Sequence, residues 1–371
     1  MAYTWENFNE EFDCVRFYNI SDPVVAARWI YTDIETFLLS VVIPIVSAVG
    51  VVGNVAFLFM LIRLPQMRTS LSSYLAVLAL CDILFLLIAN ILYAITLGQS
   101  DVSLAWPAQT PIGCAISVVS SYVWYFASLG LITLISLERY FAICHPLKHI
   151  HFQGKKRNAK LILAVLVFSV GITISVTPRY TWYHTYCLIW PNIPDFQNHQ
   201  KTVGVCGTWD IYWNVYEGFL LTSVFIISAF INCFLYAKIL LAVSSRGVLT
   251  TSQPNPESNR VRNQVARTLI INGVVFFICQ APFRIDNLDD ALEYLDVDWD
   301  LIKPSREAIV TTVGQAFLFL NSVVNPFIYV LSSGHYRQGM IEAFSWKRKP
   351  VDFSLKKVAT GATKTSRIEE D

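Results

Sequence analysis

The stretch FLFLNSVVNPFIYVLSS at residues 317–333 is apolar enough, and almost long enough, to cross a membrane. It nevertheless places Asn321, Asn325 and Pro326 at its centre. A buried amide without a hydrogen-bond partner is costly, and a proline inside a helix leaves a backbone carbonyl without its usual donor. We therefore expect these residues to find polar partners on other helices.

The composition points to a membrane protein. Of the 371 residues, 54% are hydrophobic and only 15% are charged, whereas soluble domains carry about a quarter charged residues. A membrane β-barrel would instead show alternating segments of about 10 residues. The sequence predicts an all-α membrane protein, a seven-transmembrane helix bundle followed by a short amphipathic helix. The predicted spans cover about 37–63, 71–97, 112–143, 160–178, 214–243, 266–288 and 308–331.

The chain divides into four predicted parts: an extracellular segment at 1–36, the bundle at 37–331, an amphipathic membrane-surface helix at 332–345, and a cytoplasmic tail at 346–371. The helix is expected because Tyr336, Met340, Ile341 and Phe344 recur at helical spacing among basic residues.

Lysine and arginine predict the orientation. With the N-terminus outside, seven of the 28 basic residues lie on outer segments and 21 on the inner side, the bias typical of cytoplasmic loops. We expect a multi-pass plasma-membrane protein with an extracellular N-terminus and a cytoplasmic C-terminus. The first residues have neither a basic nor an apolar signal-peptide region, so the first span is expected to direct its own insertion.

Acidic residues are concentrated at 284–300, where they either solvate a helix end or attract a cationic ligand.

Four cysteines fall on the predicted outer side, and four cysteines allow three pairings. A bridge from Cys114 to Cys206 would tie the loop before the fifth span over the mouth of the bundle, leaving Cys14 and Cys187 as the remaining possible pair. Asn19 begins an N-x-Ser glycosylation sequon on the same side.

The sequence argues against catalysis. We find no nucleotide-binding glycine pattern, no metal-ligand cluster and no loop long enough for a catalytic domain, and we interpret His145, His149 and His151 as loop residues. A transporter would show internal repeats and more spans. A membrane enzyme would need a nucleophile and base at one depth. We therefore expect neither an enzyme nor a nucleic-acid-binding protein.

Several polar residues fall inside predicted spans, where ionisable groups are functional candidates. Asp82 is the clearest, and Asn54, Ser128, Asn321 and Asn325 could share one pocket with it, filled by a sodium ion or by water. Asn321 and Asn325 are four residues apart and so face the same way. On the third span a further stripe follows one helical face, at Ser121, Tyr125, Ser128, Ile132, Ile135 and Arg139.

These residues stand in a familiar order: Gly53-Asn54, LALCD ending at Asp82, Cys114 placed 25 residues before Arg139, ERY at 138–140 followed by CHPLK, Pro282, and NPFIY at 325–329. With this set, residues 37–345 resemble the rhodopsin-like (class A) G-protein-coupled receptors.

The resemblance implies a receptor that passes ligand binding to a cytoplasmic heterotrimeric G protein across a lipid membrane. It implies an allosteric sodium pocket at Asp82, Ser128, Asn321 and Asn325. The residues implied in activation and coupling are Glu138, Arg139, Tyr140, Tyr236, Phe276, Pro282, Pro326 and Tyr329. Serines and threonines in the tail suggest arrestin as a further partner.

The chain departs from the family pattern at several positions. The fourth span lacks the usual tryptophan, Ser228 stands near the expected proline of the fifth, and Gln280 replaces the tryptophan before the sixth-span proline. Arg262 at the base of that span removes an acidic partner for Arg139.

Within the class the chain is similar to invertebrate FMRFamide receptors, in LPQMRTSLSSYLAVLALCD, TPRY and INCFLY, and to thyrotropin-releasing hormone receptors, in APFR and LNSVVNPFIY. Both families respond to short amidated peptides. An amine ligand is disfavoured because the outer half of the third span has no acid. We expect a short basic peptide to reach Tyr122, Tyr125, Glu217, Gln280, Phe283, Arg284, Asn287 and Gln315.

The hypothesis for a ligand arginine is a pair with Glu217 or with an acid of 286–293. The alternative is an internal ion pair between Glu217 and Arg284, with no role in ligand binding.

Overall fold

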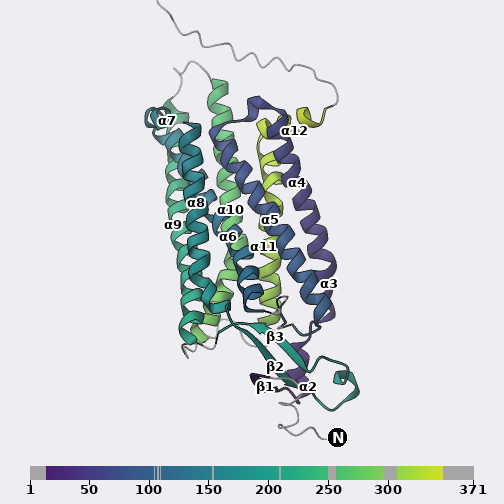
Figure 1. Ribbon diagram of the computed structural model, residues 1–371. Coiled ribbons are helices and arrows are strands. Elements are labelled where there is room, and N and C mark those ends of the chain that lie inside the picture. The colour runs from purple at the N-terminus through teal and green to yellow at the C-terminus, as the bar shows by residue number, and fades with distance from the viewer. Residues whose placement is uncertain are drawn as a thin grey trace, which may run out of the picture.

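Seven membrane-length helices form a bundle in the computed structural model (Figure 1). The structure describes residues 14–103, 105–106, 108, 110–152, 154–208, 210–249, 256–293, 295 and 307–345. Within them, seven helices are long and apolar enough to cross a membrane, over Asp33–Arg63, Ser70–Gln99, Pro111–Cys144, Lys155–Tyr180, Ile211–Ser244, Asn263–Asp289 and Thr312–Ser332. The prediction of a seven-helix bundle is confirmed.

The long helices are α4 (Ile43–Arg63), α5 (Ser70–Gln99), α6 (Pro111–Cys144), α8 (Lys155–Val176), α9 (Ile211–Leu249), α10 (Pro256–Glu293) and α11 (Glu307–Ser332). The shorter ones are α2 (Pro23–Ala26), η1 (Ala27–Trp29), α3 (Asp33–Phe37), η2 (Leu38–Val42), η3 (Pro65–Met67), α7 (Pro146–Phe152), η4 (Thr177–Tyr180), η5 (Pro194–Phe196) and α12 (Gly334–Phe344).

The first span begins four residues earlier than its apolar run, because Thr32 and Glu35 cap it. The Glu35 backbone N–H donates to Thr32 Oγ1 at 3.2 Å, and the Thr32 backbone N–H donates to Glu35 Oε2 at 2.9 Å. This reciprocal capping box satisfies two amide groups that the helix start would leave without partners.

A small sheet covers one end of the bundle, opposite α12 (Figure 1). Its strands are β1 (Arg16–Asn19), β2 (Tyr183–Ile189) and β3 (Thr202–Cys206), with β1 parallel and β3 antiparallel to the central β2. Two disulfides hold this sheet end, Cys114–Cys206 and Cys14–Cys187. The Cys14–Cys187 disulfide brings the N-terminal strand onto the hairpin of β2 and β3. Asn19 is exposed at the end of β1, and its glycosylation stays a prediction.

Two glycines let α4 approach α11 closely. A Cβ added to Gly50 would lie 2.6 Å from Val323 Cγ2, and one added to Gly53 would lie 3.0 Å from Pro326 Cγ. Side chains at these positions would push the two helices apart, so the close crossing depends on the missing Cβ atoms.

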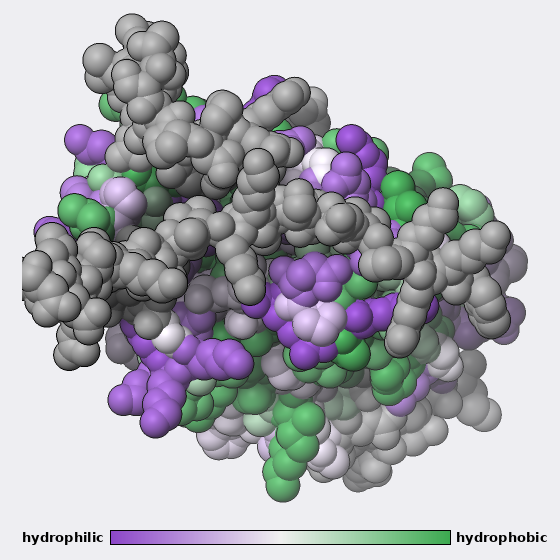
Figure 2. All heavy atoms as spheres, turned by 90° about the horizontal axis from the view of Figure 1, so that it is seen from above, coloured by the Kyte–Doolittle hydropathy of each residue, from purple (hydrophilic) through white to green (hydrophobic). Residues whose placement is uncertain are grey.

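The helix after the last span, α12, covers Gly334–Phe344, slightly less than the predicted 332–345, and its place at the membrane surface stays a prediction. Tyr336 is 3% exposed and packs in the core of the bundle, and Met340 packs against that core. Ile341 and Phe344 remain exposed. Tyr336 and Met340 face inward because α12 lies against α4 and α11. Seen from this α12 end, hydrophilic residues gather near the centre of the described surface (Figure 2).

Gly273 on α10 faces the phenol of Tyr236 on α9, and Ser136 Oγ donates to that phenol at 3.0 Å. A Cβ at Gly273 would collide with the Tyr236 hydroxyl. We expect Gly273→Ala to lower stability by about 1–3 kcal/mol, the usual effect of overpacking. Thermal denaturation of the purified protein measures this.

The matched control is Gly171→Ala on α8, because a Cβ there meets nothing within 4 Å. Alanine favours helix over glycine by about 1 kcal/mol, so this variant should match or exceed the parent. Tyr236→Phe should recover only part of the loss, because the ring Cζ of residue 236 still lies 2.6 Å from the added Cβ. Equal melting temperatures for the two glycine variants would contradict the steric explanation.

Candidate ligand pocket and polar core

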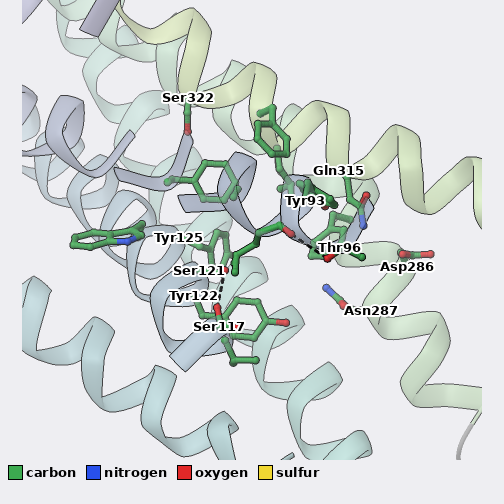
Figure 3. Close-up of a pocket in the computed structure, with 18 of the residues that line it drawn as sticks. Tyr93, Thr96, Ser117, Ser121, Tyr122, Tyr125, Asp286, Asn287, Gln315 and Ser322 are labelled. Carbon is green, nitrogen blue, oxygen red and sulfur yellow. Dashed lines mark hydrogen bonds between the residues drawn. The ribbon is translucent and has the colours of Figure 1, made fainter. Parts of the chain in front are cut away.

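A cavity of about 450 Å³ lies between α5, α6, α10 and α11. Its lining begins beside the sheet at Trp106, whose backbone N–H donates to Gly204 O of β3 at 3.1 Å. Figure 3 shows Asp286 and Asn287 at one end of the pocket and Ser322 at the other. Seven of the eight residues predicted to face a ligand line it: Tyr122, Tyr125, Gln280, Phe283, Arg284, Asn287 and Gln315. Their part in binding stays a prediction.

Arg284 is the most unusual residue of this cavity. Its guanidinium carbon lies 4.1 Å from the centre of the Tyr125 ring and 5.0 Å from that of Phe283. The residue is 2% exposed, and its Nε and Nη1 have no hydrogen-bond partner within the described part of the chain. A buried guanidinium with unused donors is well suited to an acceptor group on a ligand.

Glu217 does not line the cavity. It is 1% exposed on α9, and its carboxylate pairs with Arg179 of η4. Tyr122 and Tyr180 also donate their hydroxyls to it, at 2.9 and 2.8 Å. The alternative of an internal pair with Arg284 is therefore wrong in its partner, because Arg179 neutralises the carboxylate. TPRY contains this arginine, but 38 residues separate it from Glu217, so no local pattern reveals the contact.

Two groups of the opening stretch, the Asn325 amide and the Ser322 carbonyl, find partners on two other helices. Asn325 Nδ2 donates to Asp82 Oδ2 of α5 at 2.6 Å. Asn54 of α4 donates to the carbonyls of Gly50 and Ser322, at 2.9 and 3.0 Å. Asp82 is completely buried, so this network offsets the cost of placing polar groups inside the bundle.

The polar network around Asp82 also offers the oxygen ligands that a sodium ion needs. Asp82 Oδ1 and Asn321 Oδ1 are buried without a partner among the described residues, and Ser128 is buried nearby on α6. Carboxylate, amide and hydroxyl oxygens are ligands for hard cations. The four residues predicted for sodium thus fit the ion, and its binding stays a prediction.

Near the α12 end, Glu138 contacts the connection between α6 and α8. It is 2% exposed, His149 Nε2 lies 2.8 Å from its Oε1, and Arg157 Nη1 lies 4.0 Å from its Oε2. Our interpretation of His149 as a loop residue is wrong, because Pro146 starts a short helix, α7, which places this histidine against Glu138.

The other residues predicted for activation lie along the bundle. Phe276 and Tyr329 are buried, Tyr236 bonds Ser136, and Tyr140 bonds His145 at 3.1 Å. Arg139 is half-buried, and Pro282 and Pro326 lie within α10 and α11. The side chain of Arg262 lies outside the described residues.

Where the fifth span lacks the proline usual in the family, hydrogen bonds between polar side chains link two helices. Ser228 Oγ lies 2.8 Å from Thr133 Oγ1, and Asn232 Nδ2 donates to Thr133 Oγ1 at 2.9 Å. This bridge joins α6 to α9. Ser228 stands out in the sequence at the place of the expected proline, whereas Thr133 and Asn232 were not predicted, although polar residues inside a span are themselves a signal.

Comparison with known proteins identifies the family to which this helix bundle belongs. The family described as 7 transmembrane receptor (rhodopsin family) matches residues 53–329. Somatostatin receptor type 2 of Mus musculus is 25% identical over 312 residues, 81% of this chain and 75% of that receptor. Neuromedin-U receptor 2 of Homo sapiens is 28% identical over 316 residues, covering 82% and 72%. The thyrotropin-releasing hormone receptor of Bos taurus is 24% identical over 337 residues, covering 83% and 78%. The chain belongs to the rhodopsin family of seven-transmembrane receptors.

Proposed function

We propose that this chain is a G-protein-coupled receptor for a short peptide. The observation that carries the proposal is the cavity of about 450 Å³, which begins beside the sheet and contains the buried, partly unpartnered Arg284. The similar receptors named for somatostatin, neuromedin-U and thyrotropin-releasing hormone support a peptide ligand. The sheet end faces the extracellular space and the α12 end faces a heterotrimeric G protein, in keeping with the distribution of basic residues and the two disulfides.

We further propose that the peptide is amidated and basic, as in the FMRFamide family, with a thyrotropin-releasing-hormone-like peptide as the alternative. The second reading gains support from the similar Bos taurus receptor. Because Arg179 already neutralises Glu217, a ligand arginine would meet the acids of 286–293 instead, and Asp286 lines the cavity.

The first test is expression in cultured cells with calcium and cyclic-AMP recording. The panel contains amidated peptides, beginning with those that end in Arg-Phe-amide and including thyrotropin-releasing hormone. A nanomolar response supports the receptor proposal and identifies the peptide class. Silence across the panel, with surface expression confirmed, would contradict a receptor for short amidated peptides.

Arg284→Gln is expected to weaken the active peptide about 10- to 150-fold. The variant loses a charge-assisted hydrogen bond to a ligand carbonyl, which contributes about 1.5–3 kcal/mol. The concentration giving half the maximal calcium response measures the change. The matched control is Arg28→Gln, because Arg28 is exposed in η1 and outside the cavity. Equal potency for the two variants would remove Arg284 from the binding site.

A further inference from the structure

The cavity continues past Gln280 into the polar core. Gln280 stands one turn from Arg284 on α10, about 6 Å along the axis. Beyond it the lining includes Ser128, Asn321 and Ser322, and Figure 3 places Ser322 at the far end from Asp286 and Asn287. A tryptophan at position 280 would be bulkier than this amide, so the glutamine leaves a passage between the two levels.

The upper level of this space has unused hydrogen-bond donors. Two nitrogens of Arg284 have no hydrogen-bond partner within the described residues. The guanidinium lies over the Tyr125 ring, and the hydroxyl of that tyrosine has no partner there either. Both side chains are more than nine-tenths buried. The upper level therefore suits an acceptor oxygen.

The lower level has unused acceptors. Gln280 Oε1 and Asn321 Oδ1 are buried and have no hydrogen-bond partner in the described chain. Gln280 is 4% exposed and Asn321 is 2% exposed. Below them lies the buried carboxylate of Asp82, with Ser322 as its neighbour. The lower level therefore suits a group that donates hydrogen bonds and carries no negative charge.

Only some ligand groups match both levels. A carboxylate would meet the negative charge of Asp82, and an ammonium would have to pass Arg284, which forms no ion pair within the described residues. A primary carboxamide carries one acceptor oxygen and two donor hydrogens on the same planar group. It can accept from Arg284 or Tyr125 and donate to Gln280 and Asn321 without any charge.

We propose that Gln280 and Asn321, with Arg284 and Tyr125 above them, form a subsite for a primary carboxamide at the end of the ligand. The proposal rests on the proposed function, since it names the group by which a peptide enters the deepest part of the cavity. The proposal explains why a glutamine can stand at position 280 in place of the family's usual tryptophan: the smaller side chain admits the carboxamide and accepts a hydrogen bond from it.

The passage is tested without any ligand, by thiol accessibility. Purified Ser322→Cys receptor is treated with the uncharged reagent methyl methanethiosulfonate, and the modified fraction is followed by mass spectrometry. We expect modification at least tenfold faster than for Ser169→Cys, because Ser169 is fully buried on α8 and outside the cavity. Adding Gln280→Trp should slow the Ser322→Cys reaction by at least tenfold. Equal rates with and without the tryptophan would overturn the passage.

The chemistry of the subsite is tested with the active peptide of the panel, as its carboxamide and as its free acid. We expect the parent receptor to prefer the carboxamide at least 100-fold, and Gln280→Leu and Asn321→Leu each to reduce that preference about tenfold. The control is Asn90→Leu, the same chemical change at an amide that donates to Leu86 O of its own helix and lies outside the cavity.

The outcomes separate the two proposals. A silent panel with normal surface expression overturns the proposed function. A response in which Gln280→Leu and Asn321→Leu leave the preference for the carboxamide unchanged overturns the subsite alone.

Discussion

Glu217→Ala is expected to destabilise the receptor by about 3–5 kcal/mol, because it leaves the buried guanidinium of Arg179 without its counter-charge. The side chain of Arg179 is only 20% exposed, so water cannot replace the carboxylate fully. The hydroxyls of Tyr122 and Tyr180 lose their acceptor at the same time. The melting temperature of the purified receptor, together with surface expression at 37 °C, measures the loss.

Two further variants separate the ion pair from other effects. Asp195→Ala removes an exposed acid in η5 and should leave the melting temperature unchanged. Glu217→Leu combined with Arg179→Met removes both charges and should recover most of the stability, since an apolar pair often replaces a buried ion pair without loss. A single Glu217→Ala variant as stable as Asp195→Ala would show that the pair contributes nothing.

The same variant addresses ligand recognition. If Glu217 acts inside the receptor, Glu217→Gln should lower the response to every agonist by the same factor. If it binds a ligand arginine, as the sequence suggested, only arginine-containing agonists should weaken. The structure favours the first outcome because Glu217 already has three partners.

The spans could be predicted to within a few residues because their signal is local. An apolar run of about 20 residues can hardly form anything but a helix in a bilayer. The span predicted at 71–97, for example, is a helix over Ser70–Gln99 in the structure. The polar residues of the core were equally visible, since each is costly within an apolar run.

Partners across the bundle could not be predicted in the same way. The sequence marked Glu217 and the TPRY motif separately, but only the packing of η4 against α9 brings Arg179 to the carboxylate. β1 was missed for a similar reason: it has four residues and pairs with a strand far along the chain, so no periodicity marks it. Gln280 was recognised as a departure, but its effect on the cavity depends on three helices at once.

Removing the Cys114–Cys206 disulfide is expected to cost about 2–5 kcal/mol and to abolish ligand response. Cys206 ends β3 and Cys114 lies in the first turn of α6, so this bond holds the hairpin to the bundle at the mouth of the cavity. The double variant Cys114→Ser/Cys206→Ser avoids an unpaired thiol that could exchange with the second disulfide. Thermal denaturation and the peptide response of surface-expressed receptor measure the two effects.

The comparison with Cys14→Ser/Cys187→Ser makes this prediction specific. That variant releases the N-terminal strand, but β2 and β3 stay paired and Cys206 still joins them to α6. We therefore expect a smaller fall in melting temperature and a retained, weaker response. An equal or larger loss from the Cys14–Cys187 variant would mean that β1, rather than the link to α6, holds the mouth of the cavity in shape, because β1 pairs with β2 along its whole length.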